Sequence, residues 1–198
     1  MLHNLSKRIA FLVCENTDNI PLEIYIYGFE LLVSSIIETV VIILIGCLIG
    51  NLVETILFLI SFSSIRLFSG GYHANSYLKC FVVTMISYEL ILIMTDMLSC
   101  LSVNKIIFIA LIIFVLSIVL FIKNCPVNSK GKTIFNPKKQ KKLSIIALCI
   151  NITFAVVLFG ICQNHVLIIV LPTVFMVDTL IIIEKFKQGV GKSEKENL

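Results

Sequence analysis

The chain has 198 residues, of which 58% are hydrophobic and only 14% are charged; its net charge is +4 and its mean hydropathy is +1.03. An ordinary soluble domain carries about 25% charged residues, so this composition excludes a soluble globular protein. The remaining class is an integral membrane protein, because the apolar residues are gathered into long runs.

Residues 1–20 predict an amphipathic helix at the inner headgroup region of the bilayer. Apolar residues recur there at three- and four-residue spacing, beside basic Lys7 and Arg8. The alternative is a first helix packed on the loops. The apolar run after Arg8 is too short for a cleavable signal, so none is expected.

Six apolar segments follow, at residues 31–50, 52–65, 81–98, 106–122, 143–162 and 166–183. Five are long enough to span alone, since a crossing takes about 17–25 helical residues. The segment 52–65 is short, and is either a tilted helix extended by its flanks or a re-entrant segment. The predicted fold is an all-α integral membrane protein, with about six transmembrane or re-entrant helices in a single membrane domain over residues 1–198.

The distribution of basic residues predicts the orientation, because cytoplasmic loops collect Lys and Arg. If all six segments cross and the N-terminus is inside, the loops 66–80 and 123–142 and the tail 185–198 face the cytoplasm. Of the 16 basic residues, only Lys105 then lies outside. We therefore expect a multi-pass protein of a cell membrane, with both termini cytoplasmic and the lipid bilayer as a partner.

The seven cysteines are scattered singly, with no CxxC pair. An odd number of separated cysteines indicates small hydrophobic residues rather than disulfides or zinc ligands, so no metal site is expected. Cys80 differs from the others because it stands at the polar start of a predicted spanning helix.

Residues 66–80 read RLFSGGYHANSYLKC and bring one histidine close to one cysteine in sequence. A thiolate is a strong nucleophile once an imidazole takes its proton, so His73 and Cys80 are the candidate catalytic residues. Gly70 and Gly71 allow a sharp turn. Asn75 and Ser76 are good helix N-caps, which would place Cys80 in an early helical turn, where the helix dipole favours a thiolate.

The spacing of His73 and Cys80 sets a geometric condition. Seven residues of continuous helix separate two groups by roughly 10 Å, which is too far for proton transfer. We therefore predict a chain break before the helix that begins near Ser76, with a positive φ at Gly70 or Gly71. The His73 ring is expected within about 4–6 Å of the Cys80 sulfur.

Two acidic residues inside apolar segments are candidates for a third polar group that orients the imidazole. Glu38 and Asp178 each lie roughly 10 Å inside the predicted cytoplasmic boundary, and buried acids in a membrane face a cavity or a partner. The other interpretation is that either of them pairs structurally with Arg66. Asn75 and Ser76 are further local candidates.

The motif residues Arg66, Gly71, His73 and Cys80 resemble those of the AgrB family, membrane cysteine endopeptidases of Gram-positive quorum sensing. The resemblance extends to the chain length and the order of the apolar segments. It implies an AgrD-like propeptide substrate with an acidic C-terminal tail. By resemblance, Cys80 attacks the carbonyl at the tail junction and His73 acts as general base and then acid. An internal cysteine or serine of the peptide then closes a thiolactone or lactone. Tyr77 and Leu78 replace the aromatic pair of many members.

The alternative to a protease is a small membrane peptide transporter or channel without proteolytic activity. The intramembrane acids and Pro172 favour it, but it leaves the pairing of His73 and Cys80 unexplained. A homodimer stays open, because Glu89 lies on the helix face opposite Cys80 and needs a partner from another helix or subunit. Neither a cofactor nor a nucleic-acid partner is expected.

Overall fold

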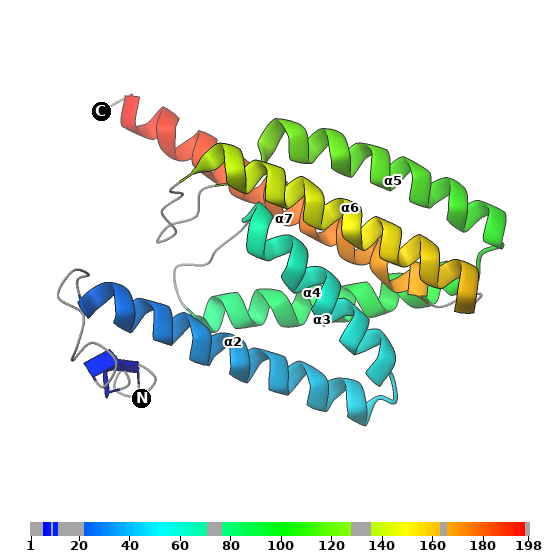
Figure 1. Cartoon of the computed structure of the whole chain (residues 1–198), viewed down its shortest axis with the longest axis horizontal. Helices are drawn as coiled ribbons and strands as arrows, with labels where there is room; N and C mark the ends of the chain where they lie inside the picture. The colour runs from blue at the N-terminus through cyan, green and yellow to red at the C-terminus, as the bar shows by residue number, and fades with distance from the viewer. Residues whose placement is uncertain are drawn as a thin grey trace. The chain divides into compact units, whose positions relative to one another are not determined.

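The computed structural model describes residues 6–8, 10, 11, 22–70, 77–127, 136–162 and 166–196. Their regular structure is helical, apart from a single backbone bridge, and this confirms the predicted all-α fold (Figure 1). The chain divides into two units, Met1–Asn51 and Leu52–Leu198. Its long helices are α2 (Leu22–Leu48), α3 (Leu52–Ser69), α4 (Tyr77–Ser99), α5 (Val103–Asn124), α6 (Pro137–Cys162) and α7 (Val166–Glu196).

The first unit consists of α2 and the N-terminal segment before it. Residues 6–8, 10 and 11 are helical, whereas the rest of the predicted 1–20 helix lies outside the described residues. Gly50, with φ +78, ends α2. The N–H groups of Gly50 and Asn51 donate to the carbonyls of Cys47 and Gly46, which is a Schellman cap.

The second unit is organised around α7, which contacts α3, α4, α5 and α6. Its residues 168–174 are all buried, as are Val177, Asp178, Leu180 and Ile181. A helix that is apolar and buried on nearly every side lies at the centre of a bundle. The apolar character of this segment therefore reflects packing against four helices as well as length.

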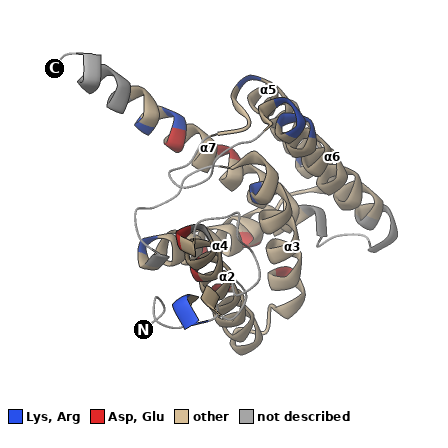
Figure 2. Ribbon diagram, turned by 60° about the vertical axis from the view of Figure 1, so that its left-hand side comes forward, with Lys and Arg blue, Asp and Glu red and all other residues tan. Residues whose placement is uncertain are grey.

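Within the described residues, five helices are long and apolar enough to cross a membrane, and they lie at Tyr25–Leu48, Leu52–Ser69, Leu78–Ser99, Val103–Asn124 and Pro137–Val157. Along them the ribbon is mostly neither acidic nor basic (Figure 2). Many large apolar side chains point outward, such as Leu111, Val115 and Leu116 of α5, and lipid covers such residues in a membrane protein. The protein is thus a multi-pass membrane protein. The short 52–65 segment is part of an 18-residue continuous helix, extended by its flank to Ser69.

Several helix ends of the second unit meet at one place. Gly70, just after α3, forms a parallel bridge with Val127, just after α5. Arg66, in the last turn of α3, contacts Cys80, in the first turn of α4. Lys141 of α6 and Lys185 of α7 act electrostatically on Cys125, which caps α5. This shared end contains the candidate catalytic cysteine.

Candidate functional site

Cys80 lies in the first turn of α4, as the sequence predicted, because α4 begins at Tyr77. Its thiol is partly buried and is not in a disulfide. The first turn of a helix carries the positive end of the dipole, which favours negative charge. The position is thus suited to a nucleophilic thiolate.

Arg66 faces this thiol directly. Its Nη2 donates to the Cys80 Sγ at 3.5 Å, and its Nη1 donates to the Thr84 Oγ1 at 3.3 Å. Thr84 in turn donates to the Cys80 carbonyl at 3.2 Å. The guanidinium carbon lies 5.3 Å from the centre of the Phe62 ring, within the range of a cation–π contact. Arg66 is one of the motif residues identified in the sequence, and the structure places its guanidinium beside the Cys80 sulfur.

Gly70 begins the connection between α3 and α4 with φ +73, the positive value predicted for Gly70 or Gly71. Its N–H donates to the Arg66 carbonyl at 3.1 Å, which closes α3, and the Val127 N–H donates to the Ser69 carbonyl at 3.0 Å. A Cβ at Gly70 would collide with the Val127 carbonyl oxygen. Only glycine therefore fits both the backbone conformation and the close approach.

The other predicted loop residues, Gly71, His73, Asn75 and Ser76, lie outside the described residues. The distance between His73 and Cys80 stays a prediction. The bounds of the flanking helices are informative nonetheless, because α3 ends at Ser69 and α4 begins at Tyr77. They are separate helices, and Cys80 belongs to the second.

Asp178 is buried at 7% exposure in α7, with its Oδ2 accepting a hydrogen bond from Ser117 of α5 at 2.5 Å. Its other oxygen, Oδ1, is fully buried and has no hydrogen-bond partner in the described part of the chain. Among the hydrogen bonds described, the carboxyl group thus joins α7 to α5. The other candidate for a third polar group, Glu38, belongs to α2 in the first unit, and its proposed role stays a prediction.

Cys125 also lies near this end of the bundle, but its environment suppresses reactivity. It is buried at 5% exposure. Burial, and secondarily the charge of Asp178, raise the pKa of its thiol to about 12. Because the thiolate is the reactive form, Cys125 is inert at neutral pH. Cys47, Cys100 and Cys149 are exposed rather than buried, so packing does not account for them.

Sequence reasoning missed Thr84, Phe62 and Val127 as parts of this site. Spacing offered a signal for two of them, because Thr84 follows Cys80 by four residues and Phe62 precedes Arg66 by four. Residues four apart share a helix face. Val127 had no such signal, because its contact with Gly70 depends on how α5 packs.

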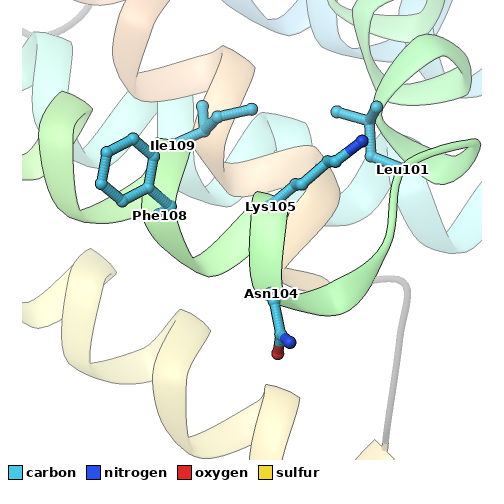
Figure 3. Close-up of a pocket in the computed structure, with 5 residues that line it drawn as sticks. All are labelled: Leu101, Asn104, Lys105, Phe108 and Ile109. Atoms are coloured by element: carbon cyan, nitrogen blue, oxygen red, sulfur yellow. The ribbon is translucent and has the colours of Figure 1, made fainter.

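A shallow pocket lies at the start of α5 (Figure 3). Leu101, Asn104, Lys105, Phe108 and Ile109 line it. It adjoins the C-terminal end of α4, roughly 30 Å along that helix from Cys80. Among the described residues, no group of three His, Cys, Asp or Glu side chains is arranged to hold a metal ion.

Comparison with known proteins gives one consistent result. The family model described as accessory gene regulator B matches residues 6–183. A "Putative AgrB-like protein" of Clostridium perfringens (strain SM101 / Type A) is 33% identical over 147 residues, covering 72% of this chain and 69% of the relative. A "Putative AgrB-like protein 2" of Clostridium perfringens (strain 13 / Type A) is 31% identical with the same coverage. No solved structure gives a significant match.

Proposed function

The chain belongs to the accessory gene regulator B (AgrB) family, and we propose that it is a membrane cysteine endopeptidase that cleaves a quorum-sensing propeptide. Membership connects the chain to the accessory gene regulator system and implies an AgrD-type propeptide as its partner. The proposal goes further, because it assigns a reaction and the residues that perform it.

One observation carries the assignment of the nucleophile. Among the described cysteines, only Cys80 combines partial burial, a place in the first turn of a helix and a guanidinium donor 3.5 Å from its sulfur. A neighbouring arginine and a helix N-terminus are the features that activate catalytic thiols. Arg66 remains charged throughout, so it cannot take the thiol proton. That task falls to His73 in the proposal.

The proposed reaction has two acyl-transfer steps. His73 takes the Cys80 proton, and the sulfur attacks the carbonyl carbon at the junction with the C-terminal tail. The C–N bond then breaks, His73 returns the proton to the leaving amine, and a thioester joins the peptide to Cys80. A cysteine or serine within the peptide next attacks the thioester, which closes a thiolactone or lactone and regenerates the thiol.

The surroundings of the thiol favour cyclisation over hydrolysis. Cys80 lies in α4 beside α3, both apolar helices long enough to span, and Arg66 contacts its sulfur. Restricting water around a reactive thioester suppresses hydrolysis. We further propose that this end of the bundle faces the cytoplasm, because it contains the lysines at the start of α6 and excludes Lys105.

Mutagenesis with a matched control tests the proposal. Purified chain reconstituted in liposomes should release the C-terminal tail of an AgrD-type propeptide. Cys80→Ala and Cys80→Ser should lower the rate on the order of a thousandfold or more. Cys149→Ala, at an exposed cysteine of α6, should retain it. Full cleavage by Cys80→Ala would refute the protease and return the chain to the transporter alternative.

A further inference from the structure

Thr84 lies one turn after Cys80 in α4 and connects two parts of the site. It is buried at 4% exposure. Its hydroxyl accepts from Arg66 Nη1 at 3.3 Å and donates to the Cys80 carbonyl at 3.2 Å. Because the hydroxyl uses its only proton on that carbonyl, its lone pairs are free to face the guanidinium. The bond to the backbone therefore fixes the hydroxyl as an acceptor for Arg66.

A second contact, with an aromatic ring, also holds the guanidinium. Phe62, one turn before Arg66 in α3, is buried at 4% exposure and lies under the guanidinium. The Phe62 ring stacks on Phe58 at 5.1 Å, and Phe58 packs against Tyr88 at 5.2 Å. This aromatic row joins α3 to α4, so Arg66 is held from both helices.

We propose that Thr84 is a positioning residue, which acts through Arg66 to hold the guanidinium against the Cys80 sulfur, with Phe62 as a second support. An arginine side chain has several rotatable bonds and loses entropy when it is fixed. The planar guanidinium can donate to two acceptors side by side, and the Thr84 hydroxyl occupies one of those positions. The second donor then points at the thiol.

This inference rests on the proposed function, because it explains how the nucleophile is prepared. A charge-assisted hydrogen bond is stronger than a neutral one, so a fixed guanidinium stabilises the thiolate more than the thiol. Arg66 and His73 then divide the work, since Arg66 holds the negative charge and His73 carries the proton. Loss of the Thr84 hydroxyl would leave Arg66 present but misdirected.

The experiment measures the alkylation rate of Cys80 by iodoacetamide, followed by mass spectrometry of the peptide that contains it. Thr84→Val removes the hydroxyl and keeps the shape, whereas Thr84→Ser keeps the hydroxyl. Thr95→Val is the matched control, because Thr95 donates to the Ile91 carbonyl four residues earlier in the same helix. That control removes an equivalent bond to the backbone at a position remote from Arg66.

At pH 7, Thr84→Val should slow Cys80 alkylation by about two- to tenfold, the range for one hydrogen bond. Thr84→Ser and Thr95→Val should alkylate at the wild-type rate. Loss of packing alone would slow Thr84→Ser as well, because serine lacks the methyl group of threonine.

The effect of Thr84→Val in a protein that already lacks the Arg66 guanidinium shows whether Thr84 acts through Arg66. In an Arg66→Gln protein, adding Thr84→Val should change the alkylation rate no further. If Thr84→Val does not accumulate, Thr84→Ala supplies the same comparison. Wild-type alkylation in Thr84→Val, an equal loss in Thr84→Ser, or an equal further loss in the Arg66→Gln background would each overturn the inference. Alkylation needs no propeptide, so these outcomes are independent of whether Cys80→Ala abolishes cleavage.

Discussion

Replacement of Gly70 by alanine tests whether the end of α3 must be built as the structure shows. An alanine at φ +73 costs about 1–2 kcal/mol in backbone strain. Its Cβ would also collide with the Val127 carbonyl oxygen, a backbone atom that no rotamer change can move aside. Displacing Val127 would break its hydrogen bond to Ser69, worth about 1 kcal/mol. We expect a total loss of about 2–4 kcal/mol.

Alanine substitutions at two other glycines distinguish the backbone strain from the collision with Val127. Gly50 has φ +78 but open space around its Cβ position, so Gly50→Ala should cost only the strain, about 1–2 kcal/mol. Gly28 lies inside α2 with nothing nearby, so Gly28→Ala should be neutral or stabilising. The midpoint of thermal unfolding in detergent should be highest for Gly28→Ala, lower for Gly50→Ala and lowest for Gly70→Ala. Equal stability of Gly70→Ala and Gly50→Ala would refute the close approach to Val127.

The remaining predictions concern sidedness and the buried acid. A thiol reagent that cannot cross membranes should label Cys80 in inverted vesicles but not in intact cells, and Cys100 should show the reverse. The protonated thiol of Cys125 should stay unlabelled in both preparations. Labelling of Cys80 in intact cells would overturn the proposed orientation. Ser117→Ala should destabilise the chain by about 1–3 kcal/mol, because the Asp178 carboxyl group stays buried without that hydroxyl. Asp178→Asn should retain propeptide cleavage, because the hydrogen bonds described give Asp178 a structural contact with Ser117. Loss of cleavage with unchanged stability would instead indicate that Asp178 orients the His73 imidazole.

The fold was predictable because a membrane imposes a length on each apolar segment. The residues at which the helices begin and end were less predictable, because they depend on local contacts. The helix α3 continues to Ser69, past the end of the apolar run at residue 65, and Arg66 in this extension contacts Thr84 and Cys80 of α4. The structure begins α6 at Pro137, before its lysines, where Asn136 accepts from the Lys139 N–H.

The central place of α7 was not predictable from hydropathy, which records how apolar a segment is but not which neighbours it meets. The candidate site likewise has features that were predictable from the sequence and features that were not. The place of Cys80 in the first turn of a helix and the positive φ at Gly70 were predictable from residue type and spacing. The guanidinium contact with Cys80 and the bridge from Gly70 to Val127 depend on packing between helices, which one sequence does not specify.

The most direct test of the central claim is to trap the thioester that the proposed reaction requires. The reconstituted chain is mixed with an AgrD-type propeptide whose internal nucleophile is replaced by alanine, quenched in acid and analysed by mass spectrometry. We predict that the peptide without its C-terminal tail becomes attached to Cys80 and is released by hydroxylamine, because cyclisation is blocked after the first step. Release of the tail with no adduct, or an adduct on another residue, would contradict the assignment of Cys80 as the nucleophile.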